Sequence, residues 1–449
     1  MAGEPTSVRT QLREFFALSR DVFVLSIAMF AFSLGFQMTS RYLSEYMVAL
    51  GASAFVVGLY GTVSNVISAI YPYPGGVISD RIGSRYALTL FGLLSAIGFG
   101  IWLIAPAAGA LAVPLLFVGV VFAQAWKSFG LGATFAIVKQ SVAPERLAEG
   151  FASTETVRRT AFLVGPLLAA GIFVLFGPAD VGSMTDSAIV TAFGVILALA
   201  VVFALLGTFA QHVLYDASGD DYGKSFAGVS QIIEDLRNLP AELRPLLVGD
   251  TLVRFANGMV YVFFVIVVTR FLGVGLSMEL PILGGIDLSP QAYFGVLLGI
   301  EMAVALLTMV PVAKFAERIG LKPVVALGFG VYAVFPVLLI TAPADAGVLA
   351  LLFAFSGLRF AGLPAHKALI VGPAEQGTGG RVTGSYYLVR NVVVIPSAAL
   401  GGALYGGVSL PGIGTVGSPP LAFGIATVIG LVGTGYFLVF GKEFTATDR

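Results

Sequence analysis

Long apolar stretches recur along the whole chain, and this pattern limits the possible folds more than any other feature. A helix that crosses a bilayer needs about 20 mostly apolar residues, and only helices and closed barrels satisfy their backbone groups inside lipid. Stretches of that length lie near residues 22–48, 53–74, 86–105, 112–138, 152–175, 187–211, 246–272, 290–312, 323–342, 346–372, 383–407 and 419–440. The sequence therefore predicts an all-α integral membrane protein with twelve transmembrane helices.

The composition agrees with a chain that lies mostly in lipid. Hydrophobic residues make up 57% and charged residues 11%, whereas a soluble domain carries about 25% charged residues. The net charge is zero, so no basic field points to a nucleic-acid partner. The chain has no cysteine and only two histidines, His212 and His366. We therefore predict no metal site and no cofactor.

The loops between the stretches alternate in charge. Basic residues precede the first stretch and follow the second, fourth, sixth and eighth: Arg9, Arg13, Arg20, Arg81, Arg85, Lys139, Arg146, Lys224, Arg237, Arg244, Lys314, Arg318 and Lys322. The opposite loops, near 106–111, 176–186, 273–289, 343–345 and 408–418, contain no Lys or Arg. Because positive loops stay inside, we expect a multi-pass protein of the cytoplasmic membrane with both termini in the cytoplasm.

The chain divides into two similar halves. A polar stretch, 212–245, separates residues 1–211 from 246–449 and contains a segment able to form an amphipathic surface helix. Matching residues recur in order at nearly constant offsets: Asp21 and Arg41 as Asp250 and Arg270, Asp80 and Arg81 as Glu317 and Arg318, Lys127 as Arg359, and Arg158 as Arg390. The repeat predicts two pseudo-symmetric six-helix bundles, an N-terminal bundle (1–211) and a C-terminal bundle (246–449), joined by a cytoplasmic linker.

A loop motif occurs once in each half. Residues 76–85, GVISDRIGSR, resemble the loop signature of the major facilitator superfamily of secondary transporters, with Ser84 at a position that is usually basic. A second copy, with Glu317 for the aspartate, ends at Lys322. The motif residues form the predicted cytoplasmic gate: Gly76, Asp80, Arg81, Gly83, Arg85, Glu317, Arg318, Gly320 and Lys322.

The resemblance implies a role for these loops. In the family, the aspartate closes the cytoplasmic side against the eleventh span, so Asp80 is expected to face Arg390. By the internal repeat, Glu317 is expected to face Arg158. The alternative is that these charges only set topology and loop shape.

A second family signature, in the fifth span of the antiporter branch, is only partly present. Gly165 and Pro166 match it, whereas alanines stand at four of its glycine positions. Small residues still allow close helix packing, so we assign Gly165 and Pro166 to helix packing. Antiport and symport both stay open.

Ionisable residues inside the spans are costly and mark pathways or buried pairs. Lys127, Glu301 and Arg359 lie near mid-membrane, so we predict that they line a central cavity, with Glu301 as a proton carrier. The alternative is a purely structural Glu301–Arg359 pair.

Further charges lie toward the ends of spans. Arg41 and Arg270 form a symmetric pair at the outer ends of spans one and seven. This pair resembles the anion-binding arginines of organophosphate transporters in the superfamily, while the alternative is that both extend to the outer interface. Asp250 and Arg254, four residues apart, are expected to neutralise each other. His366 is expected at the cytoplasmic interface.

These features favour a secondary transporter that moves a small organic solute by alternating access and is coupled to protons or another ion. An enzyme is disfavoured because no catalytic cluster and no phosphate-binding loop occurs. A non-transporting receptor or scaffold on the same fold is the alternative. The expected partners are the solute, the ion and the lipid bilayer, without nucleic acid, for a chain that acts as a monomer. Hydrophobic drug-like efflux and organic-anion transport both remain open.

Overall fold

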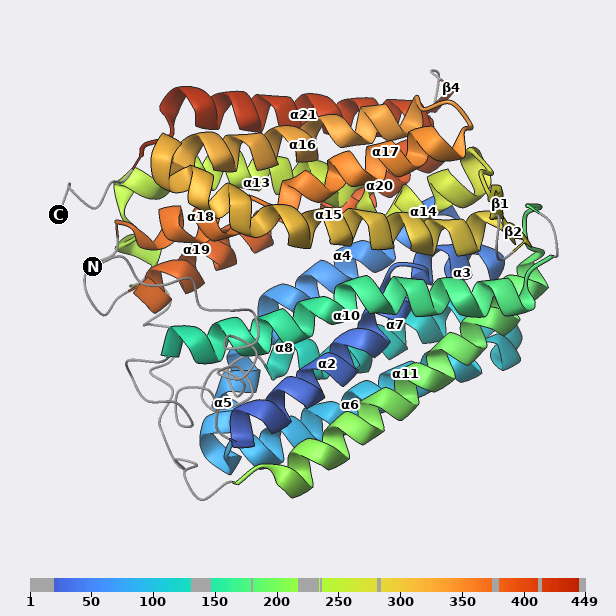
Figure 1. The fold of residues 1–449 in the computed structure, drawn as a ribbon, viewed down its shortest axis with the longest axis horizontal. Coiled ribbons are helices and arrows are strands. Elements are labelled where there is room, and N and C mark those ends of the chain that lie inside the picture. Colours follow the sequence, from blue (N-terminus) through green and yellow to red (C-terminus); the bar gives the residue numbers. More distant parts are fainter. Residues whose placement is uncertain are drawn as a thin grey trace. The chain divides into compact units, whose positions relative to one another are not determined.

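Helices account for nearly all of the described chain (Figure 1). The computed structural model describes residues 20–130, 147–178, 181–216, 234, 236–280, 284–373, 379–410 and 414–443. The α-helices of the first half are α2 (Arg20–Ser40), α3 (Leu43–Ala49), α4 (Ala54–Ile70), α5 (Pro72–Ile82), α6 (Ser84–Ile104), α7 (Ala112–Ala123), α8 (Ala125–Phe129), α10 (Leu147–Phe176) and α11 (Asp186–Leu214). Those of the second half are α13 (Arg244–Val260), α14 (Phe264–Ile266), α15 (Pro290–Ile319), α16 (Leu321–Ile340), α17 (Ala346–Gly357), α18 (Leu363–Val371), α19 (Gly379–Val394), α20 (Ser397–Gly406) and α21 (Pro419–Phe440).

Short elements connect or extend these helices. They are the 3₁₀ segments η1 (Ala105–Leu111), η4 (Ala241–Leu243), η5 (Tyr261–Phe263) and η7 (Leu358–Phe360), and the π-helical turn η6 (Val267–Phe271). Two antiparallel hairpins, β1 (Leu276–Leu280) with β2 (Gly284–Leu288) and β3 (Val408–Leu410) with β4 (Gly414–Val416), lie where loops were predicted.

Ten described helical stretches are long and apolar enough to cross a membrane, or eleven if the bent pair α4 and α5 counts as one span. One of the ten, Ser84–Phe129, is 46 residues long. It reverses direction at η1, where Gly109 has the non-helical backbone angles φ 56° and ψ −120°, and the indole Nε1 of Trp102 donates to the carbonyl of Leu116 at 2.9 Å. A multi-pass helical membrane fold is confirmed, and the total of twelve spans stays a prediction.

The chain forms two compact units. The first contains Met1–Thr39, Ile70–Gly165 and Gly194–Phe226; the second contains Ser40–Ala69, Pro166–Phe193 and Ala227–Arg449. The second unit thus combines the C-terminal half with segments of four N-terminal spans. The predicted boundaries at 211 and 245 describe the sequence repeat and stay a prediction, and residues 217–233 of the linker lie outside the described residues.

The two copies of the loop motif share one backbone conformation. Gly83, between α5 and α6, has φ 82° and ψ 156°, and Gly320, between α15 and α16, has φ 96° and ψ 164°. Each donates its N–H to the carbonyl four residues earlier, Ser79 or Ala316, at 2.9 Å. Positive φ favours glycine, so the motif glycines end one helix and start the next in both halves.

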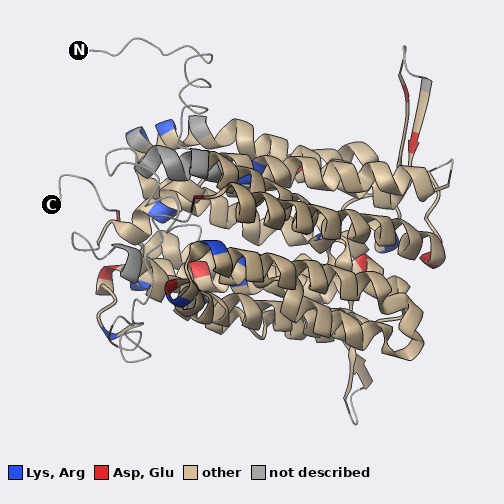
Figure 2. Cartoon of the chain, turned by 90° about the horizontal axis from the view of Figure 1, so that it is seen from below, with Lys and Arg blue, Asp and Glu red and all other residues tan. Residues whose placement is uncertain are grey.

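Small residues bring helices of the second unit into close contact. A Cβ on Gly58 of α4 would lie 2.8 Å from the Gly402 Cα of α20, and one on Gly249 of α13 would lie 2.7 Å from the Phe437 Cβ of α21. Such packing replaces hydrophobic driving force between helices in lipid. Figure 2 shows that the described helices are uncharged over most of their length, with Lys, Arg, Asp and Glu mainly near helix ends.

Candidate functional site

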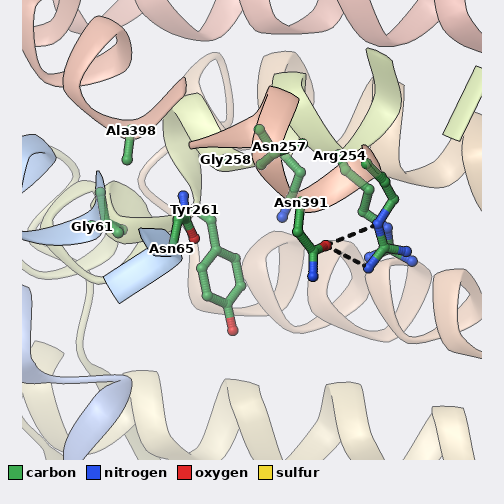
Figure 3. Close-up of a pocket in the computed structure, with 11 residues that line it drawn as sticks. Gly61, Asn65, Arg254, Asn257, Gly258, Tyr261, Asn391 and Ala398 are labelled. Carbon is green, nitrogen blue, oxygen red and sulfur yellow. Dashed lines mark hydrogen bonds between the residues drawn. The ribbon is translucent and has the colours of Figure 1, made fainter. Parts of the chain in front are cut away.

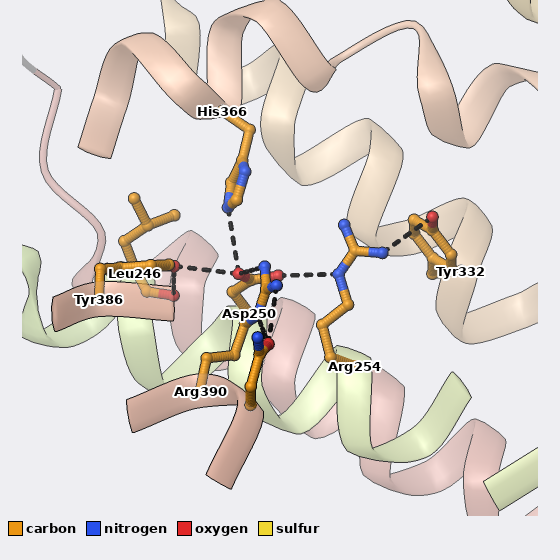
Figure 4. Close-up of polar contacts among 8 residues, drawn as sticks. Leu246, Asp250, Arg254, Tyr332, His366, Tyr386 and Arg390 are labelled. Atoms are coloured by element: carbon orange, nitrogen blue, oxygen red, sulfur yellow. Dashed lines mark hydrogen bonds and ion pairs between the residues drawn. The ribbon is translucent and has the colours of Figure 1, made fainter. Parts of the chain in front are cut away.

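A buried carboxylate holds together three helices of the second unit. Asp250 of α13 is fully buried. Its Oδ1 accepts from Arg254 Nε at 3.3 Å, and its Oδ2 accepts from Arg390 Nη1 of α19 and from the Tyr386 hydroxyl, each at 3.1 Å. His366 Nε2, on α18, lies 3.2 Å from the same Oδ2 (Figure 4). The predicted pair with Arg254 is present, but it is one part of a larger ion cluster.

This cluster carries an excess of positive charge. One carboxylate contacts two guanidinium groups, so with a neutral imidazole the group Asp250, Arg254, Arg390 and His366 has one net positive charge. Charges taken out of water are costly unless paired and hydrogen-bonded. His366 is buried, with 5% of its surface exposed, whereas the sequence predicted a place at the interface.

A polar pocket lies beside the cluster. Its volume is about 190 Å³, and it lies between α4, α13 and the helices α19 and α20. The lining residues are Gly61, Asn65, Arg254, Asn257, Gly258, Tyr261, Val262, Arg390, Asn391, Val394 and Ala398. Figure 3 shows the side chains of the three asparagines, the Tyr261 phenol and Arg254 around it. The Asn391 Oδ1 accepts from Nε and Nη2 of Arg390, at 3.2 and 3.0 Å.

The predicted mid-membrane charges lie elsewhere. Glu301 and Arg359 are both buried and pair with each other, with Arg359 Nη2 at 2.7 Å from Glu301 Oε1. The Ser356 hydroxyl donates to the same oxygen at 2.5 Å. This geometry corresponds to the structural pair that the sequence left open. Lys127, in the first unit, is exposed, with its Nζ 4.2 Å from the ring centroid of Phe36.

Tyr332 links the two ion clusters of the second unit. Its hydroxyl accepts from Arg254 Nη1 at 2.9 Å, and the Arg359 guanidinium lies 5.0 Å from its ring centroid. Charged and aromatic groups therefore follow one another from Arg390 through Asp250 to Glu301. The sequence repeat did not indicate this connection. Tyr332 is uncharged, so it does not stand out within an apolar span.

A second polar network joins the ends of helices from both sequence halves, on the side that the sequence predicts to face outward. Glu45 of α3 is fully buried, and Arg270 Nε donates to its Oε1 at 3.0 Å. The Thr269 hydroxyl and the Gln291 amide also donate to this carboxylate, at 2.9 and 3.2 Å. Arg270 Nη2 reaches Asp186 Oδ1 at 2.7 Å. We call Glu45, Asp186, Thr269, Arg270 and Gln291 the outer network.

The symmetric arginines of the two halves have different environments. Arg270 belongs to the outer network, whereas the Arg41 guanidinium lies 4.9 Å from the ring centroid of Tyr261, which lines the pocket. Glu45 was not predicted from the sequence, because it lies in an otherwise apolar stretch. Its charge, four residues after Arg41, could have indicated a buried ion pair, since a carboxylate in a span needs a partner.

The gate-loop residues lie at helix ends of their units. In the first unit Asp80 is half-buried, Arg81 is exposed, and Arg85 Nε donates to the carbonyl of His212 at 2.6 Å, which fixes α6 to the end of α11. In the second unit Arg318 is exposed and Lys322 half-buried, and the Glu317 side chain lies outside the described residues. The expected partnerships of Asp80 with Arg390 and of Glu317 with Arg158 stay predictions.

One of the two predicted packing residues, Gly165, lies close to a neighbouring helix. A Cβ on Gly165 would lie 2.9 Å from the Gln37 Cβ of α2, and Pro166 stands inside α10. Arg158, one of the predicted gate partners, is half-buried, with its guanidinium 5.6 Å from the Phe162 ring centroid. A Cβ added to the motif residue Gly76 would meet no other described atom within 4 Å outside its own helix turn.

These helices, buried ion pairs and pocket define a multi-pass protein of the transporter class, and comparison with known proteins agrees. The model of the Major Facilitator Superfamily matches residues 25–289. An uncharacterised MFS-type transporter of Methanocaldococcus jannaschii is 20% identical over 394 residues, which cover 86% of this chain and 89% of that protein. The chain belongs to the Major Facilitator Superfamily.

Solved transporters share the fold. A variant of the nucleoside transporter NupG gives a TM-score of 0.70 at 12% identity, covering 94% of this chain and 100% of that one. A bacterial homologue of the iron transporter ferroportin, in an inward-facing state, gives 0.68 at 13%, covering 94% and 99%. A POT family transporter in complex with 5-aminolevulinic acid gives 0.67 at 14%, covering 94% and 96%. The predicted fold family is confirmed.

Proposed function

We propose that this chain is a secondary active transporter that moves a small organic solute across the cytoplasmic membrane by alternating access, coupled to protons. Both termini lie in the cytoplasm in this proposal, and the chain acts as a monomer. Membership of the superfamily supports the transporter class. The observation that carries the coupling is the contact of one buried carboxylate, Asp250, with both arginines of the pocket.

The outer network supports alternating access. It ties Glu45 and Asp186, from the N-terminal half, to Arg270, from the C-terminal half, at ends that the topology prediction places outside. Alternating access requires contacts that hold one side shut and separate when that side opens. A buried ion pair suits this role because it has two discrete arrangements, formed and broken.

Asp250 is the group that we assign to proton coupling. When its carboxylate is ionised, Arg254 and Arg390 are engaged with it; when it takes up a proton, both arginines lose that partner and become available to a ligand. Proton binding therefore favours ligand binding, and by reciprocity the ligand favours proton uptake. His366, 3.2 Å from Oδ2, is placed to exchange this proton. Glu301, the carboxylate that the sequence predicted as the proton carrier, pairs with Arg359 and is not among the residues that line the pocket.

The gate loops complete the proposed cycle on the cytoplasmic side. We assign Asp80, Arg81 and Arg85, with the second copy around Gly320, to closing this side when the outer network opens. The shared conformation of Gly83 and Gly320 supports equivalent roles for the two loops.

Transport in proteoliposomes tests the proposal. An imposed pH gradient is applied across a panel of labelled carboxylates, phosphate esters, sugars and hydrophobic amines, with the wild type and Asp250→Asn. We expect a gradient-driven accumulation of at least one solute that Asp250→Asn abolishes while downhill exchange persists. Glu279→Gln, on the exposed β1 strand, is the control for carboxylate loss and keeps full accumulation. If no solute of the panel moves, the result favours the alternative that the chain is a receptor or scaffold and not a transporter.

A further inference from the structure

We propose that the pocket beside Asp250 binds a small organic anion, with its anionic group between Arg254 and Arg390 and its neutral part against the asparagine amides. The inference rests on the proposed function and names the substrate class of the same site. It decides between the two classes that the sequence left open, organic anions and hydrophobic drug-like compounds.

Charge is the first argument. Arg254 and Arg390 both line the pocket, and none of its described lining residues is acidic. The carboxylate that faces these arginines is Asp250, so one positive charge is left over. An anion bound here supplies the missing counter-charge, whereas a cation meets repulsion from the guanidinium groups of Arg254 and Arg390.

Hydrogen-bonding capacity is the second argument. Each guanidinium carries five N–H donors. Arg254 uses its Nε toward Asp250 and one Nη toward Tyr332, and Arg390 uses Nε, Nη1 and Nη2 toward Asp250 and Asn391. At least two donors of each group lie outside these described bonds. Arginine presents them in a planar fork that matches the oxygens of a carboxylate or phosphate.

The asparagine amides of the pocket favour a ligand that also has neutral polar groups. Among the described residues, the Asn257 Oδ1 is buried without a hydrogen-bond partner. A buried acceptor without a partner is costly, and this one lines the pocket with Asn65, Asn391 and the Tyr261 phenol. A ligand with hydroxyl or amide hydrogens satisfies it. The lining therefore fits a solute that carries neutral polar groups as well as an anionic one.

Size argues against the drug-like class. Pockets for drug-sized ligands have volumes of about 300–1,000 Å³, and this pocket has about 190 Å³. A small polar acid fits the volume and the lining, whereas an apolar polycyclic compound fits neither.

The absence of cysteine from the sequence allows a test that does not need the natural solute. Asn65→Cys places one thiol in the pocket, and Ser409→Cys, on the exposed β3 strand, is the control. Each protein reacts with an anionic sulfonate and with a cationic trimethylammonium methanethiosulfonate reagent. We expect the anionic reagent to be favoured at Asn65→Cys, relative to the control, by roughly a hundredfold. One unit charge about 12 Å away, at an effective dielectric constant of ~20, attracts the anion about tenfold and repels the cation about tenfold.

Arginine variants then assign the preference. In Asn65→Cys carrying Arg254→Gln or Arg390→Gln the ratio should fall toward the control value. Equal reaction with both reagents, or a preference for the cation, overturns the proposal. If an arginine variant does not fold, the ratio in Asn65→Cys alone decides.

Protection from labelling by small ligands tests which chemical group the pocket binds. Gluconate should slow the labelling of Asn65→Cys, and the neutral isostere gluconamide should not; glycerol 3-phosphate tells whether a phosphate group serves in place of a carboxylate. Protection by neither anion, or equal protection by gluconamide, overturns the anion assignment. Because labelling needs no flux, loss of transport with retained anion preference refutes the proposed function alone.

Discussion

Replacing Arg270 by glutamine should open the outer network. The substitution removes the cation that contacts the buried Glu45 carboxylate, and the hydrogen bonds from Thr269 and Gln291 stay. Breaking a fully buried ion pair costs about 3–5 kcal/mol. The Arg270 side chain is 31% exposed, so we take a lower value, about 2 kcal/mol. This corresponds to roughly a thirtyfold shift toward the outward-open state.

Asp186 provides a matched control on the same arginine. Its side chain is 57% exposed, although its oxygen lies only 2.7 Å from Arg270. Exposed ion pairs contribute about 0–1 kcal/mol, so Asp186→Asn should shift the equilibrium by about fivefold or less. The double variant Glu45→Gln with Arg270→Gln should lie closer to wild type than Arg270→Gln alone, because no buried charge is left without a partner.

A single introduced cysteine measures the shift. Met184 is 7% exposed, and its backbone N–H lies 3.5 Å from the Gln291 Oε1 of the outer network. In Met184→Cys, with opening and closing fast relative to alkylation, the rate of alkylation by a membrane-impermeant maleimide added outside should rise about thirtyfold on Arg270→Gln. An unchanged rate, or an equal effect of Asp186→Asn, would refute the assignment of the outer network as a latch.

Three further predictions concern stability and use thermal unfolding in detergent as the measurement. Arg359→Met leaves the Glu301 carboxylate buried without its cation and should cost about 3–5 kcal/mol; adding Glu301→Gln should recover most of it, and equal losses would contradict a pair. Alanine at Gly83 or Gly320, where φ is 82° and 96° and ψ is 156° and 164°, should cost about 1–3 kcal/mol through backbone strain, and an unchanged unfolding temperature would contradict it. Glu443 accepts from the backbone N–H groups of Leu321 and Lys322 at 2.8 Å, so Glu443→Gln should cost about 0.3–1 kcal/mol, and a gain in stability would contradict the cap.

Span positions could be predicted well because apolar length is a local property of the sequence. The predicted stretches 187–211 and 419–440 correspond to α11 (Asp186–Leu214) and α21 (Pro419–Phe440). Breaks inside spans were missed. The stretch 22–48 is interrupted at Arg41, between α2 and α3, and 246–272 changes to 3₁₀ geometry at Tyr261. Neither break contains a proline, so the sequence has no helix-breaking residue there by which to predict it.

The site was predictable only where partners are close in sequence or forced by burial. Asp250 with Arg254 follows from their spacing on one helix, and Glu301 with Arg359 follows from the need to pair charges within apolar spans. The partners Arg390 and His366 of Asp250 come from other helices, so their contact depends on helix rotation and packing. Sequence spacing does not carry that information, and for this reason His366 was expected at the interface.

Proton movement driven by a solute gradient tests whether Asp250 couples proton and solute. Proteoliposomes with an entrapped pH-sensitive dye receive a gluconate or glycerol 3-phosphate gradient directed inward, with no pH gradient at the start. We expect at least one anion to acidify the lumen. The acidification should be lost in Asp250→Asn and should persist in Glu279→Gln. Entry of the anion without any change in lumenal pH, or an unchanged response in Asp250→Asn, would contradict the claim that Asp250 couples proton and solute.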